Sequence, residues 1–101
     1  EVQAEGTVNV NTVYPREIVT AALKKNASAL VIAHNHPSGR LEPSSQDRQL
    51  TRTLHVVCSF MQINLLDHLI IGDGDSVYSF ADHGLMAQIR EDCRTVVESI
   101  G

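Results

Sequence analysis

Two histidines and one aspartate are the residues of this chain whose types and spacing best suit metal chemistry. His34 and His36 are two positions apart, and on a β-strand such residues project from the same face with α-carbons roughly 6.6 Å apart. Both imidazoles can therefore turn toward one ion. Zinc binds histidine nitrogen and carboxylate oxygen readily, and catalytic zinc sites typically combine three protein ligands with one position for water. Asp47 supplies the third ligand in this interpretation.

The same residues also fit structural roles that need no metal. Ser44 and Asp47 have the spacing of a variant capping box at the start of a helix. Helix caps are far commoner than metal ligands, so Asp47 taken alone favours capping. His34 and His36 can likewise be solvated residues that follow a strand, because an isolated pair of this spacing has many false positives as a motif. The residues by themselves leave both interpretations open.

The predicted elements around these residues would bring them together. Residues 29–33 form a short continuous apolar run, typical of a strand buried on both faces, and its end leads into the two histidines. Two prolines and one glycine within residues 37–43 then predict a loop. A helix that begins near Ser44 places Asp47 on its first turn. Open α/β sheets bind ligands in the crevice beyond the carboxyl ends of their strands, where the histidines would lie.

The remaining elements follow from the spacing of apolar residues. Alternation over residues 2–10 predicts a half-buried strand, and the apolar run 65–71 predicts a central strand that forms a hairpin with 77–80. Helices are predicted from Pro15 to Asn26, from Ser44 onward and beyond Gly84, so the fold class is α/β (α+β). The residues expected on the buried helix faces are Ile18, Val19, Ala22 and Leu23, then Leu50, Leu54, Val57, Cys58 and Met61, and finally Met86, Ile89, Cys93, Val97 and Ile100.

Length and composition predict one small globular domain spanning residues 1–101. A chain of 101 residues with 43% hydrophobic and 20% charged residues can build one core. The net charge of −4 argues against a broad phosphate-binding surface, and hence against direct nucleic-acid binding. The apolar run 29–33 is too short to span a bilayer, so we expect a cytoplasmic protein. Cys58 and Cys93 are expected to be buried, since neither has a second cysteine at metal-ligand spacing.

One string of residues resembles a known family signature. His34-Asn35-His36-Pro37-Ser38-Gly39, followed by Pro43-Ser44 and Asp47, is similar to the JAMM motif of the MPN/JAB metallopeptidase-like domains, and every spacing matches. Three further segments, at 15–17, 26–29 and 66–72, look like the pattern of the RadC-like branch. The resemblance runs in order from about Gly6 to Phe80. It implies a cytidine-deaminase-like JAB/MPN fold, in which helices flank a mixed sheet.

The resemblance also implies a chemistry. His34, His36 and Asp47 would be zinc ligands, and Ser44 would hydrogen-bond the zinc-bound water or the oxyanion formed when a carbonyl is attacked. The matching reaction is hydrolysis of a peptide or isopeptide bond in a protein or peptide substrate. An alternative is a binding module that keeps zinc for structure or recognition, in the context of DNA repair or replication that the RadC name suggests. Zinc binding with or without hydrolysis distinguishes the two.

The chain departs from the family pattern at its beginning. The family mechanism needs a glutamate on a strand before the one with which this chain opens, so we expect that first strand to be missing and the general base to lie upstream of residue 1. By this interpretation, residues 1–101 alone can be inactive. Glu1, Glu5 and Glu17 are better explained as acids on solvated faces or at a helix start. A sheet edge left unpaired would invite a homodimer through strand pairing.

Other polar residues carry weaker signals. Asp67, near a strand end, could orient a ligating histidine from behind. His55, His68 and His83 are expected to be surface residues or satisfied core residues. The tripeptide at 34–36 spells the letters of an HNH nuclease, but the residues of that motif come from separated positions of a ββα unit. A nuclease would also need more basic surface than this acidic chain supplies, so we reject that interpretation.

Overall fold

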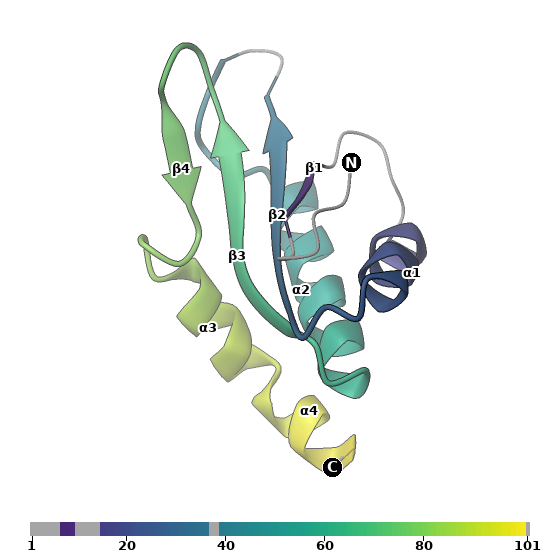
Figure 1. Ribbon diagram of the computed structural model, residues 1–101. Helices are drawn as coiled ribbons and strands as arrows, with labels where there is room; N and C mark the ends of the chain where they lie inside the picture. The colour runs from purple at the N-terminus through teal and green to yellow at the C-terminus, as the bar shows by residue number, and fades with distance from the viewer. Residues whose placement is uncertain (1–6, 10–14, 37–38, 101) are drawn as a thin grey trace.

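The computed structural model describes residues 7–9, 15–36 and 39–100, and a four-stranded mixed sheet forms its centre (Figure 1). β1 (Thr7–Asn9), β2 (Ala29–Asn35) and β3 (Asn64–Ile71) are parallel neighbours in that order. β4 (Val77–Ser79) runs antiparallel to β3. The predicted α/β class and the predicted hairpin are confirmed, and the opening strand is confirmed over Thr7–Asn9, while the rest of 2–10 lies outside the described residues.

Two helices connect the parallel strands and lie on the same face of the sheet. α1 (Pro15–Lys24) follows β1, and α2 (Ser45–Phe60) joins β2 to β3. Right-handed crossovers between strands that advance in one direction place their helices on one face, and α1 and α2 do contact each other (Figure 1). α1 ends at Lys24, because Asn26 adopts a left-handed backbone with φ of 53°. The predicted start of the second helix is confirmed, because Ser44 is the N-cap of α2.

An irregularity in β3 decides which of its side chains face the helices. β2 and β3 pair Leu30 with Leu65 and Ile32 with His68, so β3 carries one extra residue between these pairs. A bulge of this kind reverses the alternation of side chains along a strand. Leu65 and His68 are therefore both buried, whereas Leu66 is 42% exposed.

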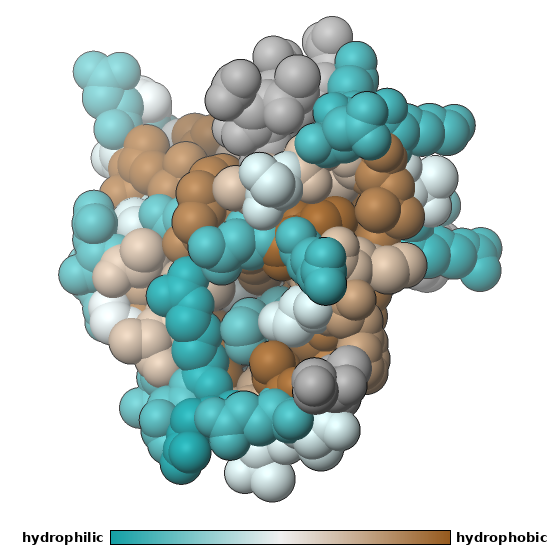
Figure 2. All heavy atoms as spheres, turned by 60° about the horizontal axis from the view of Figure 1, so that its bottom comes forward, coloured by the Kyte–Doolittle hydropathy of each residue, from teal (hydrophilic) through white to brown (hydrophobic). Residues whose placement is uncertain are grey.

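The core lies between the sheet and the helices and is mainly aliphatic. Burying each such side chain contributes about 1.5–3 kcal/mol, which holds the layers together. Polar and apolar residues mix over the surface seen in Figure 2, as on most protein surfaces. The most buried core residues are Ile18, Ala22, Leu30, Ile32, Leu54, Cys58, Leu65, Ile70, Phe80 and Met86.

Two residues predicted on buried helix faces are instead exposed. Leu23 is 44% exposed near the end of α1, and Met61 is 46% exposed. Met61 is the C-cap of α2, with φ of −92° and ψ of 6°, so its backbone has already left the helix. The apolar spacing in the sequence extends beyond the residues that face the core at the end of each helix. The prediction that these two residues are buried is therefore wrong.

The C-terminal apolar pattern forms two helices rather than the one predicted. α3 (Leu85–Asp92) and α4 (Arg94–Ile100) are separated at Cys93, whose backbone has φ of −100° and ψ of 4°. No glycine or proline marks this point, so the sequence carried no signal of the break. Met86, Ile89 and Cys93 are nevertheless buried, and both helices contact α2.

Both cysteines are buried, as predicted. Cys58 and Cys93 are not joined in a disulfide, and burial raises the pKa of the Cys58 thiol to about 11. Cys58 therefore acts as a small apolar core residue at neutral pH. No helix in the described part of the chain is long and apolar enough to cross a membrane.

Candidate metal centre

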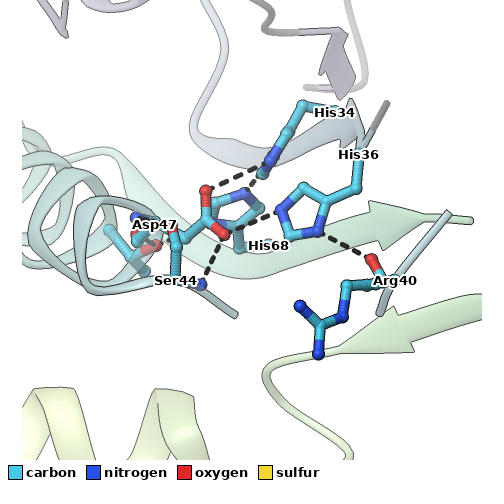
Figure 3. A network of polar contacts seen from close by, with 7 residues as sticks. His34, His36, Arg40, Ser44, Asp47 and His68 are labelled. Carbon is cyan, nitrogen blue, oxygen red and sulfur yellow. Dashed lines mark hydrogen bonds and ion pairs between the residues drawn. The ribbon is translucent and has the colours of Figure 1, made fainter. Parts of the chain in front are cut away.

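The two histidines and the aspartate come together where β2 ends and α2 begins (Figure 3). His34 lies in β2, His36 directly follows it, and Asp47 lies in the first turn of α2. One donor atom from each side chain lies within 4.8 Å of the other two. These side chains are 12%, 15% and 11% exposed, so the group is sheltered but solvent still reaches it. The fold thus brings together the predicted set.

The loop that carries the chain from His36 to α2 is anchored against the turn between β3 and β4. The His36 N–H donates to the Ile71 carbonyl at 3.1 Å, and the Gly39 N–H donates to the His36 carbonyl at 2.9 Å. Gly39 has φ of 77°, a conformation that favours glycine. A β-carbon at Gly39 would lie 2.4 Å from Asp73 Oδ2. The left-handed backbone, rather than this close approach, favours glycine here, because the Asp73 side chain can move aside.

Asp47 caps α2 and faces the histidines at the same time. Ser44 Oγ accepts from the Asp47 N–H at 3.0 Å, and Asp47 Oδ2 accepts from the Ser44 N–H at 2.8 Å, which is a capping box. The carboxylate oxygens also lie 3.1 Å from His34 Nε2 and 2.9 Å from His36 Nε2. The two interpretations left open by the sequence are therefore compatible, because the cap orients the carboxylate toward the imidazoles.

Each imidazole is held from behind through its Nδ1 atom. His36 Nδ1 lies 2.7 Å from the Arg40 carbonyl oxygen. A carbonyl oxygen can only accept, so Nδ1 carries the hydrogen and Nε2 presents a lone pair. His34 Nδ1 lies 2.9 Å from Nε2 of His68, whose own Nδ1 lies 2.6 Å from Thr51 Oγ1. The structure therefore adds a second layer of residues behind the predicted group.

His68 and Thr51 were not predicted to belong to the site. His68 is fully buried, as one of its expected roles required, and it stacks on Phe80 with ring centroids 4.6 Å apart. A sequence signal for Thr51 did exist, because residues four apart on a helix are neighbours and Thr51 is one turn after Asp47. For His68 the spacing offered no comparable signal, since its contact with His34 joins two different strands.

The possibility that Asp67 orients a ligating histidine finds no support in the hydrogen bonds of its carboxylate. Its carboxylate accepts from the backbone N–H groups of His68 and Ala81 at 2.7 and 2.9 Å, and from the Ser79 hydroxyl at 2.5 Å. Neighbouring residues on a strand point to opposite faces, so Asp67 points away as His68 points toward α2. The carboxylate thus holds the connection after β4 instead of a metal ligand.

The other histidines have the structural roles expected of them. His83 is exposed and stacks on Tyr78, with ring centroids 4.0 Å apart. His55 is half-buried on α2, where burial and the nearby Arg90 charge lower its pKa. Glu17 is exposed in the first turn of α1, which agrees with a helix-start acid. Glu1 and Glu5 lie outside the described residues.

The electrostatics of the group favour a bound cation. Burial lowers the pKa of His34, although Asp47 opposes this effect. For Asp47, burial alone would raise the pKa, but the hydrogen bond from the Ser44 backbone and the close contact with the His36 imidazole lower it overall. At neutral pH, His34 is thus an uncharged lone-pair donor beside a carboxylate anion. Electron-pair donors that face one another around a negative charge are stabilised by a positive ion between them.

The donor set also fits a metal ion in its geometry. Metal bonds of about 2.0–2.2 Å to nitrogen and oxygen in a tetrahedral site place donors roughly 3.3 Å apart. The distances from Asp47 Oδ1 to His34 Nε2 and from Asp47 Oδ2 to His36 Nε2, at 3.1 and 2.9 Å, are close to this spacing, and the donor atoms of the whole group lie within 4.8 Å of one another. Neutral imidazole and carboxylate are established metal ligands. His34, His36 and Asp47 therefore form a candidate site for a divalent metal ion.

A hollow of about 280 Å³ opens beside this group. It is shaped by the loop that leads into α2, so a molecule bound there would lie next to the candidate metal site. The residues that line the hollow are His36, Arg40, Glu42, Pro43 and Ser44.

A mixed sheet built from parallel crossovers, with a His-His-Asp group at a strand end, is consistent with a JAB-type domain that carries a candidate metal site. Residues 1–85 match the family model described as RadC-like JAB domain, and the chain belongs to that family. The resemblance found in the motif is thereby confirmed.

Curated relatives agree with this assignment. UPF0758 proteins of Vibrio parahaemolyticus, Vibrio atlanticus and Pseudomonas fluorescens are 54%, 52% and 48% identical to the chain over 84 residues. Each alignment covers 83% of this chain and 37% of the relative, so the chain spans just over a third of the length of these relatives. The names of these three relatives state no activity.

Proposed function

We propose that this chain is a zinc-dependent hydrolase domain of the JAMM metallopeptidase type, which cleaves peptide or isopeptide bonds. One observation carries the proposal. His34, His36 and Asp47, which match the JAMM motif, lie close together in the fold with Ser44 beside them. Two imidazole nitrogens and one carboxylate oxygen are donors typical of catalytic zinc. The family match supports the proposal because it spans all four residues.

Each residue has a distinct task in this chemistry. Zinc, when bound, would lower the pKa of water to about 7 and polarise a substrate carbonyl. His34 and His36 would hold the ion through their Nε2 atoms, and the Asp47 carboxylate would neutralise part of its charge. Ser44 Oγ already accepts from the Asp47 N–H, so its hydroxyl hydrogen is available to a carbonyl oxygen that gains negative charge. Such preorganised donors stabilise the transition state of acyl transfer.

The hollow beside the group supports a peptide-like substrate. Its volume of about 280 Å³ lies near the lower end of the range for small-molecule pockets, so it fits a short segment of chain. His36 and Ser44 both line it, and a segment bound there would bring its carbonyl close to the site. The DNA-repair context suggested by the family name would concern the identity of the substrate or partner, and the site geometry does not depend on it.

The test combines metal analysis of the purified chain with a hydrolysis assay. We expect about one zinc per chain by elemental analysis after zinc is supplied at neutral pH. His34→Ala, His36→Ala and Asp47→Ala should lose it, whereas the matched control His83→Ala, which changes an exposed histidine elsewhere, should keep it. Zinc-dependent cleavage of fluorogenic peptide or isopeptide substrates should follow the same pattern in a longer chain that includes the upstream segment expected to carry the general base.

The outcomes separate the two candidate functions. If the wild-type chain binds no zinc, the proposal is overturned. If zinc binds in the expected pattern but the longer chain cleaves no substrate in the peptide and isopeptide panels, the binding-module alternative is favoured over the hydrolase.

A further inference from the structure

We infer that His68 and Thr51 form a positioning pair that holds His34 in the tautomer able to bind a metal ion. Thr51 acts through His68. His68 in turn acts through His34, and a hydrogen bond joins these two histidines in Figure 3. This role rests on the proposed metal site and is independent of hydrolysis. We call these two residues the positioning pair.

The direction of the hydrogen bonds is set by the backbone of α2. The Thr51 hydroxyl donates to the Asp47 carbonyl oxygen at 2.7 Å. A hydroxyl has only one hydrogen, so Thr51 Oγ1 can only accept from His68 Nδ1, which lies 2.6 Å away. His68 therefore carries a hydrogen on Nδ1.

The other nitrogen of His68 then faces His34 as an acceptor. The His68 side chain is 0% exposed to solvent. Its two ring nitrogens contact the uncharged side chains of Thr51 and His34. A second ring hydrogen would create a buried imidazolium, which is costly without a charged partner. Nε2 of His68 thus keeps its lone pair and accepts from His34 Nδ1 at 2.9 Å.

This assignment leaves His34 with the nitrogen that a metal needs. With its hydrogen on Nδ1, His34 presents the Nε2 lone pair, 3.1 Å from Asp47 Oδ1. Histidine ligands typically donate the N–H of their second ring nitrogen to a carboxylate or a backbone carbonyl, which can only accept. Here the acceptor is a neutral imidazole, which accepts only in one of its two tautomers. Thr51 therefore selects the tautomer of His68, and His68 selects that of His34.

Asp47 contributes to the site through two different groups. Asp47 gives its carboxylate to the candidate metal site and its backbone carbonyl to Thr51. All the hydrogens in the series point in one direction, from His34 toward that carbonyl, and such aligned hydrogen bonds strengthen one another. Loss of the Thr51 hydroxyl would allow the remaining hydrogen bonds of the series to reverse direction, which would place a hydrogen on His34 Nε2.

Thr51→Val is the sharpest test, because it removes the hydroxyl from a buried residue with little change of shape. We expect metal affinity to fall roughly 10- to 100-fold, measured with zinc in competition with a chromophoric chelator. We also expect His34 in the metal-free protein to shift toward the form with hydrogen on Nε2, measured by nitrogen-15 NMR of the imidazoles. Thr51→Ser keeps the hydroxyl and should retain both properties. Thr53→Val, a matched change two positions along the same helix, should alter neither.

A second pair of variants covers the case in which Thr51→Val does not fold. His68→Gln can place its amide oxygen near the Nε2 position and accept from His34, so it should retain metal affinity, whereas His68→Leu should lose it. If Thr51→Val or His68→Leu is folded and keeps both the wild-type His34 tautomer and the wild-type affinity, the inference is overturned. If the wild-type chain binds no zinc, the proposed function fails, yet the NMR measurement on metal-free protein still decides whether the pair sets the tautomer.

Discussion

Adjacent residues of β3 hold two polar clusters that serve different parts of the molecule. Neighbouring side chains on a strand point to opposite faces, so one cluster lies toward α2 and the candidate metal site, and the other toward the connection from β4 to α3. The site-side cluster consists of His34, Asp47, Thr51 and His68, and the corner cluster consists of Asp67, Ser79 and Ala81.

The two clusters differ in what their central groups can do. An ionised carboxylate can only accept hydrogen bonds. The Asp67 side chain therefore suits a fixed role, in which it accepts from two backbone N–H groups and a hydroxyl. The His68 imidazole can donate or accept at either nitrogen, so its surroundings determine what it presents to His34. We therefore expect the corner cluster to affect folding alone and the site-side cluster to affect both folding and metal binding.

Acid should break the site-side cluster, with the largest expected effect on stability. Burial, followed by the charge of His34, lowers the pKa of His68 from 6.5 to about 4, although Asp47 and Asp67 oppose the shift. The unfolded chain then binds a proton more readily than the folded chain does. The free energy of unfolding should therefore be highest above pH 6.5 and fall as the pH drops from 6.5 to about 4. A pKa difference of this size corresponds to about 3 kcal/mol.

Urea unfolding of the metal-free protein between about pH 4 and pH 7 measures this effect. His68→Gln cannot titrate, so its profile should be flatter over the same range. A variant profile as steep as that of the wild type would contradict the assignment and point to His34 and His55, whose pKa values are also lowered.

Removing the corner cluster should lower stability while metal binding stays unchanged. Asp67→Ala deletes three hydrogen bonds and leaves their donors without this partner, so we expect the free energy of unfolding to fall by about 2 kcal/mol. Asp67→Asn keeps one oxygen for the two N–H groups and should lose less. Zinc affinity, measured by chelator competition, should match the wild type in both variants. A tenfold loss of affinity in folded Asp67→Asn would show that the two clusters are coupled.

The residues of the candidate site differ in how far they could be predicted from the sequence. His34, His36 and Asp47 were predictable because the strand, loop and helix that join them are adjacent in the chain and have clear local signals. The positioning pair depends on contacts between separate elements. The extra residue in β3, which turns both Leu65 and His68 toward the helices, has no glycine or proline to mark it. Packing decides that detail, as it also decides the break at Cys93.

Ser44 should show the smallest effect on stability, and it separates the cap from the chemistry. Ser44→Ala removes the acceptor for the Asp47 N–H and should cost about 1 kcal/mol, whereas Ser44→Gly should cost only about a few tenths of this. Both variants lack the hydroxyl proposed to stabilise the oxyanion, so hydrolysis should fall about 100-fold or more in each, with zinc content unchanged. Unfolding curves and the hydrolysis assay are measured side by side. If activity instead recovers with stability in Ser44→Gly, then Ser44 serves the site only by capping α2 and orienting Asp47.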